Sequence, residues 1–245
     1  MSGHSKWANI KHRKGAQDAK RAKVFTKILK EITIASRMGG GDANANPRLR
    51  TALDKGKENN VPKDNMDRAI KKGTGDLDGV NYEEYTYEGY AAGGVAVLVE
   101  VMSDNRNRSG GEVRSIFTKN NGSMAEAGAV SWNFERKGTL TVHDVSEEDI
   151  MDLAIENNAE DFEDNGGSVT VYCAPENFEG LRSALIAQHK VTDAEVTMVP
   201  KNTVKVEDSG TARQILKLLD AMEDHDDVQN VFANFDMDEA LLEEE

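Results

Sequence analysis

The sequence contains very little cysteine and no long hydrophobic run. Its single cysteine, Cys173, excludes an internal disulfide and a cluster of thiolate metal ligands, and it indicates a reducing compartment. No apolar stretch approaches the ~20 residues that a membrane-spanning helix needs. The first residues, MSGHSKW, also lack the apolar core of a secretion signal. We therefore expect a soluble, cytoplasmic protein without a membrane partner, in which Cys173 is a small buried hydrophobic residue.

The sequence also lacks the motifs that mark most catalytic and cofactor sites. It contains no Ser-His-Asp set, no metal motif and no Walker loop. His4 and His12 have no nearby Cys or carboxylate cluster that could complete a metal site or orient a proton transfer. We expect no catalytic residue, no metal and no cofactor, and the protein is predicted not to be an enzyme. An enzyme would need a pocket around Arg106, Arg108 and nearby carboxylates.

Positive charge is scarce overall but concentrated at one end. The chain carries a formal charge of −14, from 30 Lys and Arg against 44 Asp and Glu. Residues 1–75 hold 18 Lys and Arg against 7 Asp and Glu, a net +11, so the other residues carry −25. Such asymmetry points to contact with nucleic acid or a membrane surface.

Helical periodicity dominates the basic region. Phe25, Ile28, Leu29 and Ile32 form one apolar stripe of a helix that starts near Gln17 and ends at the glycines 39–41. A second helix is predicted from Asn46-Pro47 to Asn59-Asn60, and a third from Val61-Pro62 to Gly73. Four lysines fall opposite the apolar stripe of the first helix, toward solvent or phosphate: Lys20, Lys23, Lys27 and Lys30.

After a glycine-rich linker at residues 73–79, the period changes to that of strands. Strands are predicted at residues 83–90 and 95–102, joined by a hairpin at Gly93-Gly94, followed by a helix at 109–120 and a strand at 129–134. The next elements alternate as βαββαβ: strand 139–143, helix 146–157, strands 161–163 and 168–173, helix 175–188, and strand 194–199. The last elements are strand 203–206, helix 211–222 and strand 228–235.

This order predicts an α+β protein of three domains. The βαββαβ unit, residues 136–202, has the ferredoxin-like order. The strands before it have no complete set of partners unless the C-terminal segment returns to them. We therefore predict a helical domain at residues 1–75 and a discontinuous α+β domain, 80–135 plus 203–245, into which the ferredoxin-like domain is inserted.

Several long motifs support a family resemblance. GHSKWANIKHRKGAQDAKRAKVFTK, GGGDANANPRLRTALDKGKENNVPKDNMDRAIKKGTG, DNRNRSGGEVRSIFTKNNG and GAVSWNF resemble the YebC-type regulatory protein family, which includes a mitochondrial translational activator of a cytochrome oxidase subunit. The resemblance runs almost end to end. It implies three domains, the first helical and the others α+β. It also implies control of gene expression through nucleic acid or the ribosome rather than catalysis.

The opening segment is the main candidate for binding. Lys6, Lys11, Arg13 and Lys14 follow neither helical nor strand periodicity, so they could become ordered against phosphates as counterions leave. Trp7 either stacks on an unpaired base or packs onto the first helix. The predicted nucleic-acid-binding residues are Lys6, Trp7, Lys11, His12, Arg13, Lys14, Lys20, Arg21, Lys23, Lys27, Lys30, Arg48, Arg50, Lys71, Lys72, Arg106 and Arg108.

Two further groups have competing interpretations. Arg106 and Arg108 stand at the start of a predicted helix, where free N–H groups and the helix dipole favour an anion. The alternative is an ordinary capped loop whose arginines contact surface carboxylates. Four tyrosines between residues 82 and 90 could offer a stacking surface, but the interleaved glutamates favour strand packing.

The sequence thus predicts a cytoplasmic nucleic-acid-binding regulator of gene expression. It would act either on DNA, as a transcriptional regulator, or on RNA, as a ribosome-associated translation factor. The lack of a clear helix-turn-helix dimer favours structured RNA. The alternative is an interaction adaptor whose acidic domains bind a basic partner. No oligomeric state is predicted.

Overall fold

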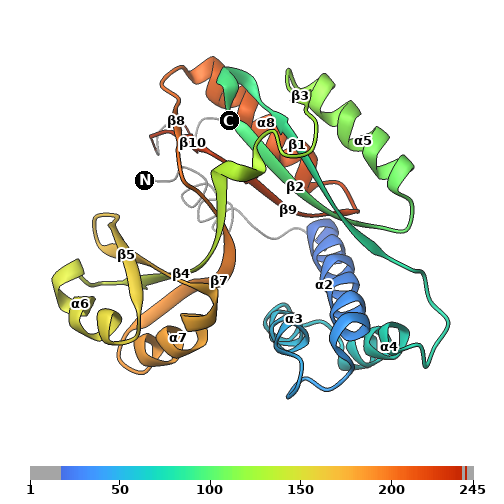
Figure 1. The fold of residues 1–245 in the computed structure, drawn as a ribbon, viewed down its shortest axis with the longest axis horizontal. Coiled ribbons are helices and arrows are strands. Elements are labelled where there is room, and N and C mark those ends of the chain that lie inside the picture. The colour runs from blue at the N-terminus through green and yellow to red at the C-terminus, as the bar shows by residue number, and fades with distance from the viewer. Residues whose placement is uncertain (1–17, 239–240, 242–245) are drawn as a thin grey trace.

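The computed structural model describes residues 18–238 and Leu241, and side chains from residue 22 onward (Figure 1). Within this range it has an α+β fold with seven α-helices and mostly antiparallel sheets. Figure 1 shows three bodies: the three helices nearest the N-terminus, a four-stranded sheet above them, and a second four-stranded sheet beside them. No described helix is both long and apolar enough to cross a membrane.

The first three helices form where the sequence predicts them. They are α2 (Asp18–Gly39), α3 (Pro47–Glu58) and α4 (Lys63–Thr74). Asn46 caps α3, since its side chain accepts the N–H of Leu49, and Pro47 occupies the first helical position. Both α3 and α4 pack along α2, around a core that includes Ile32, Leu49 and Met66.

The helix α4 extends beyond its predicted end at Gly73. A Cβ on Gly73 would lie 2.3 Å from the carbonyl oxygen of Thr33, so this glycine allows α4 to approach α2 closely. The terminating residue is Gly75, which adopts a left-handed conformation at φ 87° and donates its N–H to Lys71. The glycine-rich linker therefore starts two residues later than predicted.

The central sheet has the strand order β3-β1-β2-β9 and contains both early and late segments of the chain. Its strands are β1 (Glu83–Tyr90), β2 (Ala96–Ser103), β3 (Ser123–Met124) and β9 (Val228–Ala233). A short 3₁₀ turn, η1 (Ala92–Gly94), joins β1 to β2, with positive φ at Gly93 and Gly94. Because β9 pairs with β2, with Val99 opposite Val231, the C-terminal segment returns to complete this sheet.

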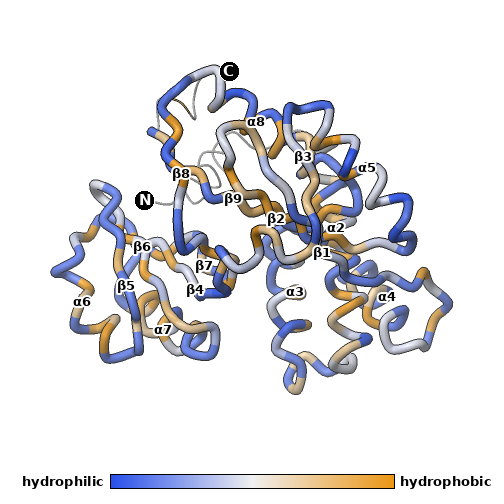
Figure 2. The backbone as a smooth tube through the Cα atoms, turned by 45° about the horizontal axis from the view of Figure 1, so that its top comes forward, coloured by the Kyte–Doolittle hydropathy of each residue, from blue (hydrophilic) through white to orange (hydrophobic). Residues whose placement is uncertain are grey.

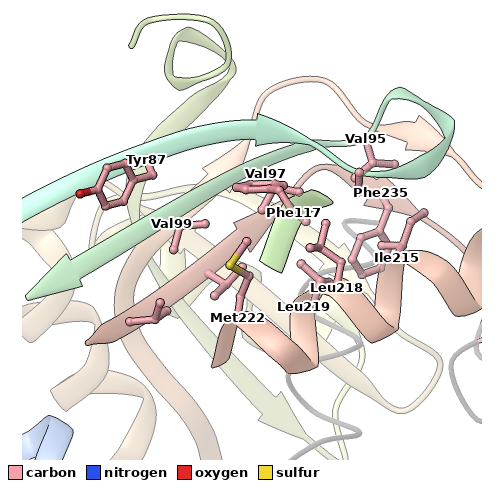
Figure 3. Close-up of a cluster of buried hydrophobic side chains, with 14 of the residues drawn as sticks. Tyr87, Val95, Val97, Val99, Phe117, Ile215, Leu218, Leu219, Met222 and Phe235 are labelled. Atoms are coloured by element: carbon pink, nitrogen blue, oxygen red, sulfur yellow. The ribbon is translucent and has the colours of Figure 1, made fainter. Parts of the chain in front are cut away.

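Two helices cover one face of the central sheet. These are α5 (Arg106–Lys119) and α8 (Ser209–Glu223), and Phe117, Ile215, Leu218 and Leu219 are fully buried between them and the strands (Figure 3). Hydrophobic colour follows β2 and β9 through the middle of the molecule in Figure 2. The short strands β8 (Val204–Lys205) and β10 (Phe235–Asp236) pair in parallel beside this core.

The predicted strand at residues 129–134 is wrong. This segment covers the other face of the central sheet and contains a 3₁₀ turn, η2 (Ser131–Asn133). The buried carboxylate of Glu88 accepts N–H groups from Gly128 at 2.7 Å, Val130 at 2.6 Å and Ser131 at 2.9 Å. These donors are therefore not available to a neighbouring strand, and pairing begins only at Phe134.

The second sheet has the order β5-β6-β4-β7, all antiparallel. Its elements follow one another as βαββαβ: β4 (Phe134–His143), α6 (Glu147–Glu156), β5 (Ala159–Asp164), β6 (Ser168–Cys173), α7 (Phe178–Ile186) and β7 (Lys190–Pro200). A 3₁₀ turn, η3 (Pro175–Asn177), precedes α7. Leu140, Ile150 and Leu181 are buried in its core, as is Cys173, as expected. The capping box of Ser146 and Asp149 at α6 is also confirmed.

Candidate nucleic-acid interface

The exposed face predicted for α2 is mostly a contact with the central α+β body. Lys30 is 7 % exposed, and its ammonium lies 2.7 Å from Asp227 Oδ1 and 2.9 Å from the carbonyl oxygen of Asp226. One turn earlier, Lys27 donates to the carbonyl of Glu223 at 2.8 Å. The prediction that Lys30 faces solvent or phosphate is therefore wrong, because the turn between α8 and β9 covers it.

Asp227 is the centre of this contact. Besides Lys30, it accepts hydrogen bonds from Arg108 Nη2 at 2.8 Å and from the Ser103 hydroxyl at 3.0 Å. Burial alone would raise the pKa of the Asp227 carboxyl, but the hydrogen bonds and charges of Lys30 and Arg108 outweigh it and lower the pKa to about 2. Asp227 thus joins α2 to the end of β2 and to the first turn of α5.

Lys23, nearer the N-terminal end of α2, makes a contact of the same kind as Lys27 and Lys30. Its ammonium lies 2.9 Å from the carbonyl oxygen of Asp224 and 3.3 Å from that residue's carboxylate. Its side chain is 40 % exposed, so water competes for this contact. Lys23, Lys27 and Lys30 therefore all contact the segment 223–227, with exposure falling along the helix.

The predicted anion site at the start of α5 also differs from expectation. The helix starts at Arg106 rather than at residue 109, because the side chain of Asn105 accepts the N–H of Arg108 and caps it. The guanidinium of Arg108 pairs with Asp104 at 3.0 Å and with Asp227. Arg106 is exposed and lies over the ring of Tyr85, with 5.3 Å between the guanidinium carbon and the ring centroid. For Arg108 the alternative reading, contact with carboxylates, is the one that the structure shows.

Arg48 is likewise paired with acidic side chains of the protein itself. Its guanidinium bridges Glu31 of α2, at 2.7 Å, and Glu84 of β1, at 2.5 Å. The hydrogen bonds that Arg48 donates to Glu84 raise the pKa of Arg48 above its usual value, and Glu31 adds to this effect against the opposing effect of burial. This bridge is a second link between the helices and the central sheet.

Three other predicted cations are exposed and have no acidic partner among the described residues. These are Arg50 on α3 and Lys71 and Lys72 on α4. Arg68, one turn before Lys72, is also exposed, and it was not among the predicted binding residues. Its signal in the sequence is its spacing from Lys72, since residues four apart share a helix face.

Eight predicted residues have side chains outside the described part of the chain. Lys20 and Arg21 belong to α2, but only their backbone is described. The others precede residue 18: Lys6, Trp7, Lys11, His12, Arg13 and Lys14.

The four tyrosines between residues 82 and 90 lie in different environments. Tyr87 is buried in the core of the central sheet, and Tyr85 is partly buried against it. Tyr90 is 38 % exposed, and its hydroxyl donates to the carbonyl of Ala129. Tyr82 precedes β1 and lies near Lys30, with 5.3 Å between the ammonium and the ring centroid. Strand packing thus accounts for two of the four.

One group of side chains has the composition of a metal site. Ligand atoms of Glu112, His225 and Asp227 lie within 4.8 Å of one another. They already form hydrogen bonds, however: His225 Nε2 lies 2.9 Å from Glu112, and His225 Nδ1 accepts the N–H of Asp227 at 3.1 Å. Since both oxygens of Asp227 also accept from Lys30 and Arg108, we assign this group to the contact between α2, α5 and β9.

The chain matches two family descriptions that together cover most of its length. Residues 5–76 match the TACO1/YebC protein N-terminal domain, and residues 82–235 match the TACO1/YebC second and third domain. The chain belongs to the TACO1/YebC family. This confirms the resemblance seen in the sequence motifs.

Individual members of the family are similar along their whole length. Proteins named probable transcriptional regulatory protein from Syntrophobacter fumaroxidans and Geotalea uraniireducens are 53% and 56% identical, each alignment covering 99% of both chains. A crystal structure of a conserved hypothetical protein from Aquifex aeolicus is 45% identical, with a TM-score of 0.80 over 91% of this chain and 93% of that one. The family is thus one of regulatory proteins, by the names of its members.

Proposed function

We propose that this protein is a cytoplasmic nucleic-acid-binding regulator of gene expression that binds phosphates through its basic N-terminal region. Relatives that share its whole length are named probable transcriptional regulatory proteins, which supports a regulatory role. We also propose three domains: a helical domain at 1–75, an α+β domain at 80–135 plus 203–245, and an inserted ferredoxin-like domain at 136–202. The two separate four-stranded sheets, with orders β3-β1-β2-β9 and β5-β6-β4-β7, support this division.

The observation that carries this proposal is the unpaired positive charge on α3 and α4. Arg50, Lys71 and Lys72 are exposed without an acidic partner among the described residues, in a protein with 14 more acidic than basic side chains. Carboxylates are abundant enough to neutralise these cations, as they do for Arg48 and Arg108. Unpaired cations grouped on two adjacent helices are suited to contact phosphates, which release counterions on binding.

We favour structured RNA, as on a ribosome, over sequence-specific DNA. A recognition helix in the major groove contacts base edges through its N-terminal residues. The helix α4 instead carries Asp64 and Asp67 in its first turns and its cations Lys71 and Lys72 in its last turn. Together with Lys63 and Arg68, these acids leave the first two turns without net positive charge to attract the two phosphate backbones of a major groove, so α4 is poorly suited to insertion.

The test compares variants that lose the same charge at different places. Arg50→Ala/Lys71→Ala should weaken binding to a structured ribosomal RNA fragment and reduce the slope of log affinity against log salt by about 1.4 to 1.8, since each phosphate contact contributes about 0.7–0.9. The control is Lys57→Ala/Lys205→Ala, because both of these lysines are exposed but paired, with Asp54 and Glu207. A duplex DNA of equal length distinguishes the two nucleic acids.

The same comparison extends to the N-terminal arm. We expect Lys11→Ala/Arg13→Ala/Lys14→Ala to weaken binding across sequences and to flatten the salt dependence in the same way. Unchanged affinity and unchanged slope in both sets of variants would overturn the proposal.

A second candidate function is supported by the acidity of the inserted unit. Residues 136–202 hold 14 Asp and Glu against 5 Lys and Arg, a net −9, and the first turn of α6 carries three acids in a row. Such a surface suits a basic protein partner, as expected of an interaction adaptor. Co-purification of a basic ribosomal or polymerase subunit that survives nuclease treatment would favour this function over direct nucleic-acid binding.

A further inference from the structure

A groove of about 380 Å³ lies between α2, α4 and the segment that leads from α4 into β1. Its volume is in the range of sites for small organic ligands. Its walls include Leu29 and Lys30 from α2, Asn65, Arg68 and Lys72 from α4, and Tyr82 from the connecting segment. None of the ten lining residues is acidic, although acidic residues outnumber basic ones in the chain by 44 to 30.

The charge of the groove comes from α4. Asn65, Arg68 and Lys72 follow one another at spacings of three and four, so they share one face of the helix. Arg68 and Lys72 are exposed and form no ion pair among the described residues. Lys30 contributes little net charge, because Asp227 neutralises it at 2.7 Å. The groove therefore presents two free cations and an amide on one wall.

The rest of the lining includes Tyr82, whose ring centroid lies 5.3 Å from the Lys30 ammonium, together with aliphatic and threonine side chains. Tyr82 is held in place through its backbone, since Arg37 donates to its carbonyl oxygen at 2.8 Å. Leu29 is partly buried, and Val80, which also lines the groove, is 47% exposed. Burial, together with the charges of Asp104 and Asp227, raises the pKa of the Tyr82 phenol, so the ring stays neutral and does not repel an anion.

We propose that this groove binds a single nucleotide, with its phosphate on Arg68 and Lys72 and its base against Tyr82. A phosphate satisfies two adjacent cations through charge-assisted hydrogen bonds, and a base fits a wall formed by an aromatic ring and aliphatic side chains. The proposal deepens the proposed function, on which it rests for the class of ligand. The nucleotide has two sources, a free mononucleotide or one unpaired nucleotide of a bound strand.

The experiment uses the full-length chain and two probes, adenosine 5′-monophosphate and a 5′-labelled single-stranded RNA 12-mer. We expect Arg68→Ala/Lys72→Ala to weaken binding of at least one probe by about tenfold or more. Tyr82→Ala should weaken the same probe, whereas Tyr82→Phe, which keeps the ring, should bind nearly as the unchanged protein does. Adenosine, which lacks the phosphate, should bind equally poorly to the unchanged protein and to Arg68→Ala/Lys72→Ala.

The matched control is Lys57→Ala/Lys63→Ala, which removes two cations of α3 and α4 that lie outside the groove and outside the proposed binding residues. Thermal melting of each variant establishes that it is folded. If Arg68→Ala/Lys72→Ala weakens binding of the monophosphate, the ligand is a free nucleotide. If it weakens binding of the 12-mer alone, the ligand is one nucleotide within a strand.

The proposal is overturned if neither probe distinguishes Arg68→Ala/Lys72→Ala from Lys57→Ala/Lys63→Ala. In that case binding of structured RNA that still depends on Arg50 and Lys71 would leave the proposed function standing. Conversely, a groove that binds the monophosphate in a protein that binds neither RNA nor DNA would support the site and contradict the proposed function.

Discussion

The basic residues of α2 and α4 look alike in the sequence and have opposite environments in the structure. Lys23, Lys27 and Lys30 on α2 all contact residues 223–227, at the end of α8 and in the turn before β9. Lys71 and Lys72 on α4 are exposed and unpaired among the described residues. The difference shows that a basic helix face can hold two parts of one protein together instead of facing solvent.

The reason lies in how many bodies each helix contacts. One side of α2 packs on α3 and α4, and its N-terminal end lies beside the central sheet (Figure 1). Residues from Ile32 to Ser36 are accordingly all buried. A lysine on such a helix can be buried only where a carboxylate offsets the loss of its hydration, and Asp227 supplies this at Lys30.

The largest predicted effect is the loss of Asp227. We expect Asp227→Ala to lower the free energy of unfolding by about 3–5 kcal/mol, because it leaves the buried ammonium of Lys30 without its partner. Asp226→Ala is the matched control, because it removes the same charge from a neighbouring side chain that is exposed. Urea unfolding followed by circular dichroism measures both. Equal destabilisation by the two substitutions would mean that Lys30 is not held as described.

The second prediction concerns acid. The pKa of Asp227 is about 2, below its ordinary value of 3.8, so the carboxylate stabilises the fold fully above pH 4 and loses this contribution as the pH falls through 2. The difference in unfolding free energy between the unchanged protein and Asp227→Asn should therefore shrink by about 2 kcal/mol between pH 5 and pH 2. A constant difference over that range would contradict the assignment.

Much of the fold could be predicted because local patterns and packing agree. The Asn46-Pro47 start of α3, the strand at residues 83–90 and the capping box of α6 carry their signals within a few residues, and each appears as expected. Residues 129–134 alternate as a strand does, yet Glu88, about forty positions earlier, binds their N–H groups. No local pattern records a partner so distant in the sequence.

The candidate site was less predictable for the same reason. The sequence identifies Lys30 and Arg108 as basic residues, but Asp227, which neutralises both, lies about 120 to 200 positions away. The groove has a weaker signal, since Arg68 and Lys72 share a helix face while Tyr82 joins them only through the path of the linker. Charge and periodicity thus located the basic region, and only the fold separates its paired cations from its free ones.

The smallest predicted effect, that of Lys23, provides the finest test of the comparison between the two helices. This residue lies between the two cases, because it contacts Asp224 but is 40 % exposed. We expect Lys23→Ala to lower the free energy of unfolding by less than about 1 kcal/mol, as for other exposed ion pairs. We also expect it to leave RNA affinity and its salt slope unchanged, in contrast to Lys71→Ala, which removes the same charge. If Lys23→Ala reduced the slope as much as Lys71→Ala does, the exposed end of α2 would belong to the binding face, and only Lys27 and Lys30 of these three lysines would remain as contacts with residues 223–227.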